Sequence, residues 1–161
     1  MKLEDFFKII PKLPGVRVFQ FTDSFNIAKK LCDFSKSMGF ELEIVTFDEE
    51  LFEKLKYLKD EDIKIRKIPE NKEKYNLRSI AYDTIFVTLD IKSLSDIEEF
   101  LRKSYRIMKN GANIVLEVDK NDKNWIIDLL QKCNYVAINE TTLDDSRLLF
   151  TAKKLHGWTR V

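Results

Sequence analysis

Histidine and cysteine are scarce in this chain, which has one histidine and two cysteines among 161 residues. The single histidine, His156, excludes any metal site built on two histidines, and no cysteine cluster takes their place. Cys32 and Cys133 occupy apolar positions of helix-like segments, where a cysteine typically packs as a small hydrophobe. We therefore predict two free, buried thiols, no disulfide and no metal centre.

An excess of charge is also missing, since 28 lysines and arginines face 27 aspartates and glutamates. This balance does not indicate nucleic acid or an anionic membrane as a partner. Basic residues do gather between residues 64 and 78, but acidic residues alternate with them, which is typical of a solvated face of mixed charge. The basic members are Lys64, Arg66, Lys67, Lys72, Lys74 and Arg78.

Long hydrophobic runs are absent as well, and none approaches the ~20 residues of a membrane helix. Residues 1–10 mix charged and apolar side chains, a pattern that predicts an amphipathic helix rather than a signal peptide. We expect a soluble, cytoplasmic protein without a membrane partner.

Glycine is missing from the loop after the first predicted strand, because none of the 4 glycines lies between Gly15 and Gly39. Residues 16–21 have the pattern of a buried strand, residues 22–24 offer helix-capping groups, and an amphipathic helix follows up to Met38. This is the layout of a nucleotide-binding strand, loop and helix, in which glycines normally let the backbone approach the ligand.

Strands and helices alternate along the chain after Pro11 and Pro14 end the first helix. Strands are predicted at 16–21, 41–47, 82–89, 113–118, 135–141 and 147–153, and the alternation of isoleucine with basic residues predicts an edge or near-edge strand at 63–68. Helical periodicity predicts helices at 24–38, from 48, from 95 and from 122. The polar run 69–78 is predicted to be a loop or a short exposed helix. Asn110-Gly111 is the expected end of the third of these helices, and Asp122 the expected cap of the fourth.

This alternation predicts an α/β fold, namely a three-layer αβα sandwich with a mostly parallel seven-stranded sheet. Turn residues at 143–146 join the last two strands, so these form an antiparallel C-terminal pair. We expect a single domain over residues 1–161, with an N-terminal helix in 1–14, a Rossmann-like core in 15–155 and a tail in 156–161.

Two segments resemble the class I S-adenosylmethionine-dependent methyltransferases. Residues 17–31 follow the first motif of that family, and residues 104–116 follow its helix, turn and fifth strand, where a lysine and a glycine commonly precede the strand. The order of a helix, five strand-and-helix units and a terminal antiparallel pair extends the resemblance over nearly the whole chain. It implies a methyltransferase-like fold and S-adenosylmethionine as the cofactor.

The first motif departs from the family's pattern. Gln20 stands where the family has an acidic residue, and Thr22, Ser24 and either Phe25 or Asn26 stand at its three glycines. A non-glycine residue held in a left-handed conformation costs about 1–2 kcal/mol, and side chains here also occupy ligand space. We therefore predict weak or lost cofactor binding. If the cofactor does bind, the resemblance places it on the backbone around Thr22, Ser24 and Asn26.

Asp48 follows the second strand, where the family uses a carboxylate to hold the ribose hydroxyls. An aspartate before an amphipathic helix is also an ordinary helix cap, and Glu49 and Glu50 suit the same helix start. Both interpretations of Asp48 stay open.

Asp90 ends the fourth strand, at the carboxyl edge where open parallel sheets place their sites. The resemblance puts it near a methyl acceptor, which makes it the candidate catalytic residue. Its alternatives are the phosphoacceptor of a receiver domain, to which Asp23 would contribute, and a plain strand-end carboxylate. Glu117 and Asp119 point the same way from the fifth strand, as an acid–base or ion-holding pair or as a solvated strand end.

The tail contains Trp158, which either packs on the sheet or anchors a protein partner or a second copy of the chain as a homodimer. Two functions follow. The first is a degenerate methyltransferase-like domain that acts as an interaction or regulatory protein. The second is an active S-adenosylmethionine-dependent methyltransferase with an atypical loop, because methyl transfer needs mainly alignment of the acceptor and the cofactor. We favour the first, because the glycines are missing.

Overall fold

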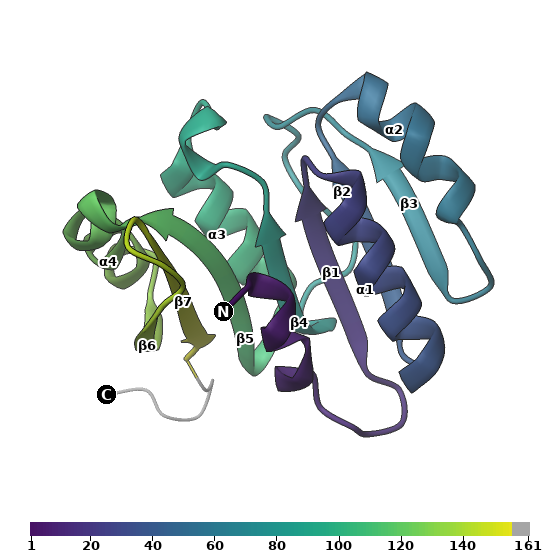
Figure 1. Ribbon diagram of the computed structural model, residues 1–161, viewed down its shortest axis with the longest axis horizontal. Coiled ribbons are helices and arrows are strands. Elements are labelled where there is room, and N and C mark those ends of the chain that lie inside the picture. Colours follow the sequence, from purple (N-terminus) through teal and green to yellow (C-terminus); the bar gives the residue numbers. More distant parts are fainter. Residues whose placement is uncertain (156–161) are drawn as a thin grey trace.

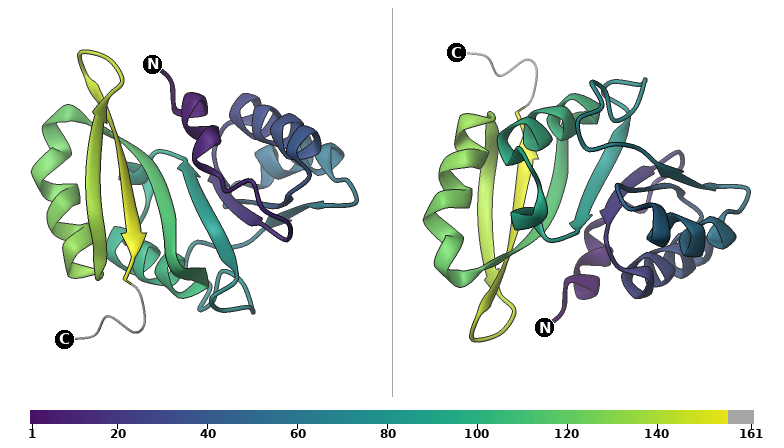
Figure 2. Two further views of the ribbon diagram at one scale, coloured as in Figure 1. Left: turned by 90° about the horizontal axis from the view of Figure 1, so that it is seen from below. Right: turned by 90° about the horizontal axis from the view of Figure 1, so that it is seen from above.

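The computed structural model describes residues 1–155, which form one seven-stranded sheet with helices on both faces (Figures 1 and 2). The strand order is β3-β2-β1-β4-β5-β7-β6, and the neighbouring pairs from β3 to β5 are parallel. Strand β7 pairs antiparallel with both β5 and β6. The predicted mostly parallel sheet with an antiparallel C-terminal pair is therefore confirmed.

The strands are β1 (Arg17–Thr22), β2 (Glu41–Thr46), β3 (Ile63–Lys67), β4 (Tyr82–Thr88), β5 (Met108–Asp119), β6 (Tyr135–Thr142) and β7 (Arg147–Lys154). The α-helices are α1 (Phe25–Met38), α2 (Glu49–Leu55), α3 (Ile97–Ile107) and α4 (Lys123–Lys132). Short 3₁₀ helices are η1 (Leu3–Ile9), η2 (Lys56–Leu58), η3 (Ile91–Ser93) and η4 (Lys120–Asp122). The predicted N-terminal amphipathic helix is thus a 3₁₀ helix, and it buries Leu3 and Phe7.

The sheet separates two apolar cores. On one face η1, α1 and α2 pack against strand residues such as Val18, and Leu31 of α1 and Leu55 of α2 are fully buried there. On the other face α3 and α4 pack against residues such as Phe21, with Phe100 of α3 buried beside it. Successive residues of a strand point to opposite faces, so β1 contributes to both cores.

The connection between β3 and β4, residues 68–81, contains no helix (Figure 1), which agrees with the predicted loop. Its Tyr75 is buried, and its ring centroid lies 5.2 Å from that of Phe21, 5.8 Å from Phe100 and 5.9 Å from Phe47. The Tyr75 hydroxyl donates to the Glu70 carbonyl at 3.0 Å. The connection has no helix, and the ring of Tyr75 covers the sheet over β1 instead.

Two local predictions are wrong. Helix α3 ends at Ile107 and β5 begins at Met108, so Asn110 and Gly111 lie within a strand rather than at a helix end. Gly111 has a φ of 78° and the β4–β5 register shifts in this region, so these turn residues form an irregularity in the strand. Asp122 does not cap α4, because its carboxylate lies 2.7 Å from the Lys92 ammonium instead.

Cys32 and Cys133 are both free and buried, as predicted. Burial raises the pKa of the Cys32 thiol to about 11, and burial also raises the pKa of Cys133. Over residues 1–155, no helix combines the length and the apolar character that a membrane span needs.

Candidate functional site

The loops that carry the predicted site residues meet at one edge of the sheet. Parallel register places Phe21 of β1 beside Val45 of β2 and Val87 of β4, close to the carboxyl end of each strand. The loops after these three strands therefore emerge side by side. The structure therefore brings together the loops that contain Ser24, Asp48 and Asp90.

The loop after β1 satisfies its own backbone with its side chains. The Thr22 hydroxyl accepts a hydrogen bond from the Ser24 N–H and donates one to the Ser24 carbonyl, each at 3.0 Å. The Ser24 hydroxyl caps α1 by accepting from the Ile27 N–H at 3.5 Å. Amides at a helix N-terminus are natural donors to a ligand, and here two of them are engaged within the protein.

This loop has an ordinary backbone conformation. None of the residues from Thr22 to Asn26 has a positive φ, and Ser24 is extended with a φ of −129°. The left-handed strain that we predicted for non-glycine residues is therefore absent. What distinguishes the loop is its side chains, since Phe25, 36% exposed, and the exposed Asn26 stand on the first turn of α1.

Gln20 lies just before this loop and is fully buried. Its amide nitrogen donates to the Thr88 hydroxyl at 3.0 Å, and that hydroxyl donates to the Phe21 carbonyl at 3.1 Å. Gln20 Oε1 has no hydrogen-bond partner in the described part of the chain. A buried acceptor without a donor costs about 1–3 kcal/mol, so Gln20 Oε1 is an unsatisfied polar atom in the strand that leads into this loop.

Asp48 makes the contacts of a helix cap. Its Oδ2 accepts from the Leu51 N–H at 3.0 Å, and its own N–H donates to the Thr46 hydroxyl at 3.2 Å. The residue is exposed, and an exposed carboxylate in a cap can accept further hydrogen bonds. Capping of α2 and binding of a ribose are therefore compatible at this position.

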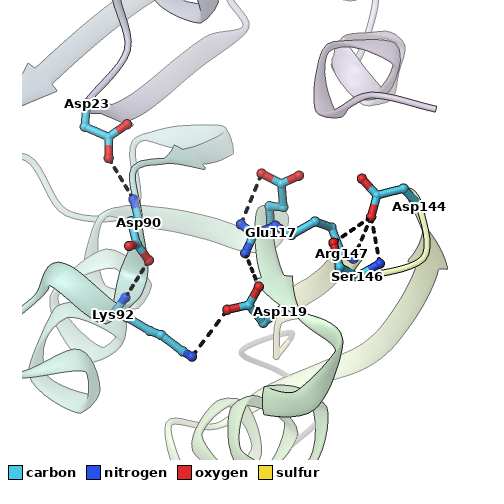
Figure 3. Close-up of polar contacts among 8 residues, drawn as sticks. All are labelled: Asp23, Asp90, Lys92, Glu117, Asp119, Asp144, Ser146 and Arg147. Carbon is cyan, nitrogen blue, oxygen red and sulfur yellow. Dashed lines mark hydrogen bonds and ion pairs between the residues drawn. The ribbon is translucent and has the colours of Figure 1, made fainter.

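Asp23 and Asp90 join the loops after β1 and β4 (Figure 3). Asp23 Oδ2 accepts from the Asp90 N–H at 2.9 Å, and Asp90 Oδ1 accepts from the Lys92 N–H at 3.0 Å at the start of η3. The cavity that borders Asp90 measures about 10 Å³, room for about one water molecule. The receiver alternative for Asp90 is wrong, since receivers have the strand order 2-1-3-4-5 and this sheet does not.

Glu117 and Asp119 point to the same side of β5, as predicted, and both pair with Arg147 of β7 (Figure 3). Arg147 Nη2 lies 3.4 Å from Glu117 Oε2, and Nη1 lies 2.7 Å from Asp119 Oδ1. The hydrogen bonds from Arg147 and from Lys92 hold the pKa of Asp119 below its ordinary value. The two carboxylates thus serve as partners of a cation, an interaction that the sequence did not reveal because Arg147 comes from another strand.

Several predicted or missed residues lie elsewhere. His156 and Trp158 lie outside the described residues, so the partner contact of Trp158 stays a prediction. A cavity of about 290 Å³, bordered by Arg66, Arg78 and Tyr82, opens at the opposite edge of the sheet. Arg66 and Arg78 were predicted to lie on a solvated face rather than at a site, because charge alternation along a sequence does not show which side chains a fold gathers around a recess.

The sequence and the fold of this chain are similar to those of known proteins. A family model described as the ubiE/COQ5 methyltransferase family matches residues 11–135. No curated protein gives a sequence match.

Solved structures of methyltransferases have the same fold. A SAM-dependent methyltransferase from Aquifex aeolicus superposes with a TM-score of 0.75 at 18% identity, covering 94% of this chain and 88% of the other. One from Mesorhizobium loti gives 0.72 at 11% identity, with 95% and 98% covered. Phosphoethanolamine N-methyltransferase 2 of Haemonchus contortus, in complex with S-adenosyl-L-methionine, gives 0.76 at 12% identity, with 96% and 52% covered. The chain thus spans about half the length of some relatives and nearly all of others, and the resemblance to class I methyltransferases is confirmed.

Proposed function

We propose, since this chain belongs to the ubiE/COQ5 methyltransferase family, that it is a methyltransferase-like domain with weakened or lost S-adenosylmethionine binding that acts by binding a partner. The observation that carries this proposal is the self-capped turn after β1. The Ser24 N–H is engaged by the Thr22 hydroxyl, and the Ile27 N–H by the Ser24 hydroxyl. A cofactor that used these amides would first have to displace both side chains.

The cost of this displacement is large enough to matter. Each internal hydrogen bond contributes about 0.5–1.5 kcal/mol net, so losing two costs about 1–3 kcal/mol. Since about 1.4 kcal/mol is a factor of ten in affinity, the turn lowers cofactor affinity by roughly 5- to 150-fold. The bond from the Asp90 N–H to Asp23 supports the same proposal, because it ties together two loops that a ligand would have to separate.

A second function, an active methyltransferase with an atypical loop, is favoured by Gln20. Its buried Oε1 lacks a donor within residues 1–155, as expected of a residue that contacts a ligand. When bound, S-adenosylmethionine supplies an electrophilic methyl group, so the chain would have to bind, orient and exclude water. In this function Asp90 would lie near the methyl acceptor. The residues that would hold the cofactor are Thr22, Ser24, Asn26 and Asp48.

Thermal unfolding with and without 1 mM S-adenosylhomocysteine separates the two functions. Ligand at 100 times its dissociation constant adds about 2.7 kcal/mol, a rise in Tm of several degrees for a domain of this size. The proposed function predicts at most a small rise for the wild type, since binding is weakened or lost. A large, saturable rise in the wild type would contradict the proposed function and show the intact cofactor site that the second function requires.

The double variant Thr22→Gly/Ser24→Gly tests the reason for weak binding. It frees the two amides, so we expect it to gain a ligand-dependent rise in Tm. Ser37→Gly is the matched control, since it removes a hydroxyl from the exposed end of α1 without touching the loop. A double variant that folds and stays unresponsive would show that the self-capped turn is not what blocks the cofactor.

The partner in this proposal is a protein or a second copy of the chain, bound through Trp158. Trp158→Ala should therefore lower the mass measured by light scattering or abolish capture of that partner. An unchanged assembly would remove Trp158 from the proposal.

A further inference from the structure

The sheet has a recess at the edge opposite the cofactor loops. It measures about 290 Å³, close to the lower limit of small-molecule pockets at about 300 Å³. It lies on the α3 face, where the helix-free connection between β3 and β4 passes the amino ends of β1, β2 and β4. The lining residues that matter here are Arg17, Glu43, Arg66, Asn76, Arg78 and Tyr82.

The floor of the recess is a buried polar network around Glu43, which is 6% exposed. Glu43 Oε2 accepts from Arg66 Nη2 at 2.9 Å and from Asn76 Nδ2 at 2.7 Å. Asn76 Nδ2 also donates to the Tyr82 hydroxyl at 3.0 Å. The carboxylate is therefore compensated, and the Tyr82 hydroxyl, which accepts from Asn76, keeps its own hydrogen to donate.

Two arginines hold the wall of the recess in place. Arg66 Nη2 donates to the Tyr75 carbonyl at 2.6 Å. Arg106, on α3, donates to the carbonyl of Asn76 at 2.7 Å and to that of Leu77 at 3.3 Å. The recess is therefore preformed and does not depend on a ligand to order the connection.

The lining carries equal numbers of basic and acidic side chains, but arginines outnumber carboxylates around the Tyr82 hydroxyl. Burial raises the pKa of Tyr82 to about 12 and Glu43 adds to the rise, while Arg78, Arg66 and Arg17 oppose it. Three guanidinium groups and one carboxylate thus act on this hydroxyl. Arg66 Nε is buried and lacks a hydrogen-bond partner in the described structure, so donors here outnumber the acceptors that the protein supplies.

The other acidic residues of the lining do not reverse this balance. Glu41 pairs with Arg17 at 2.7 Å, which leaves the Arg17 terminal nitrogens for another acceptor. Glu61 and Asp62 are exposed, and they also line a separate cavity with Lys36 and Phe40. They therefore stand at the border of the recess rather than at its inner end.

We propose that this recess binds a small organic anion, whose charged group is held by Arg17, Arg78 and the Tyr82 hydroxyl. Leu77, which is exposed and also lines it, contacts the apolar part of the ligand. Carboxylates and phosphates share the chemistry that an arginine fork recognises. The site lies away from the cofactor loops, so it does not depend on whether S-adenosylmethionine binds.

NMR titration of the wild-type protein tests the proposal with three probes. Benzoate and inorganic phosphate, each up to 10 mM, should give saturable shifts of the Asn76 side-chain amide if the site takes a carboxylate or a phosphate respectively. Benzylamine, which matches benzoate in shape but is a cation, should give none. The proposal is overturned if neither anion shifts this signal, or if benzylamine shifts it as strongly.

Two variants show whether the named groups bind the anion. Arg78→Gln, at an exposed position outside the buried network, should raise the dissociation constant about tenfold or more, as expected for a lost charged hydrogen bond. Tyr82→Phe keeps the ring and should weaken binding several-fold. Lys54→Gln, exposed on α2 at the other face, is the matched control for charge and should change nothing. Equal weakening by Arg78→Gln and Lys54→Gln would mean non-specific attraction and would contradict the site.

Discussion

Thr22 and Ser24 affect the loop after β1 in two ways. Their side chains occupy space that glycines would leave empty, and their hydroxyls bind backbone groups that a ligand would otherwise use. The backbone itself is unstrained, so the replacement of glycine has no conformational cost in the folded protein. The loop is therefore stable without a ligand.

Ion pairing at the end of β5 predicts a dependence on pH at one residue. The hydrogen bonds from Arg147 and Lys92 lower the pKa of Asp119, so its ionised form is favoured in the folded protein. This contribution to the free energy of unfolding is present above the ordinary carboxyl pKa of about 4 and is lost as the pH falls through the lowered folded value. In Arg147→Gln the pKa of Asp119 should rise towards its ordinary value.

A carbon-detected NMR titration of the Asp119 carboxyl measures this pKa directly. Lys132→Gln, which removes a partner of Glu98 instead, should leave the Asp119 curve unchanged. A wild-type Asp119 that titrates like an unpaired aspartate would contradict the ion pairs seen here.

At the scale of the elements, the helix-free connection between β3 and β4 contacts both the sheet and the start of α3. Tyr75 packs among Phe21, Phe47 and Phe100, and Glu70 Oε2 accepts from the N–H groups of Ser95 and Asp96 at 2.8 and 3.1 Å, just before α3. The connection is thus fixed to the sheet by an aromatic ring and to α3 by a carboxylate. This arrangement also forms the wall of the recess.

Truncation of Tyr75 should therefore destabilise the protein strongly. Tyr75→Ala removes a fully buried ring and should lower the free energy of unfolding by about 3–5 kcal/mol, as for other large aromatic truncations. Tyr75→Phe loses only the bond to the Glu70 carbonyl and should cost about 1 kcal/mol. Urea unfolding measures both, and a cost below about 1 kcal/mol for Tyr75→Ala would show that the ring is not part of the core.

Elements were predictable where a local pattern and the tertiary structure agree. The predicted bounds of β1 to β4, β6 and β7 agree with the structure to within one residue at each end. For β1, β2 and β4 the reason is that a strand buried on both faces is apolar throughout, whereas β3 and β6 are edge strands with exposed side chains. Asn110-Gly111 was wrongly predicted to end a helix, because β4 pairs with Met108 before it and with Asn113 after it, so the turn residues form an irregularity inside β5. The prediction that Asp122 caps α4 is wrong because its ionic partner, Lys92, is distant in sequence.

The candidate site was predictable in position but not in its contacts. Thr22, Ser24, Asp48 and Asp90 were located by the strand ends that precede them. Their hydrogen bonds depend on side-chain directions that no periodicity encodes. The Arg147 pairs and the recess around Tyr82 join residues from several strands, so only the folded chain shows them.

At the scale of the whole molecule, one sheet separates two apolar cores, and its strands contribute side chains to both. Cys32 lies in the core under α1, and Cys133 lies in the core under α3 and α4. Neither core can lose its strand residues without exposing the other. We therefore propose that the chain is a single domain that unfolds in one step.

The two thiols are natural probes of this cooperativity. Burial raises the pKa of both, so alkylation at pH 8 should be slow in the native protein and fast after unfolding. Pulse alkylation across a urea series, read by mass spectrometry, should give Cys32 and Cys133 the same midpoint. Midpoints that differ clearly would indicate two units that unfold separately.

The most direct test of the central claim is an NMR titration of the wild-type protein with S-adenosylhomocysteine that follows the backbone amides of Ser24 and Ile27. Because the Thr22 and Ser24 side chains hold these amides, we predict that neither signal moves at micromolar ligand. Saturable shifts of both amides at micromolar ligand would contradict the account and identify a working cofactor site.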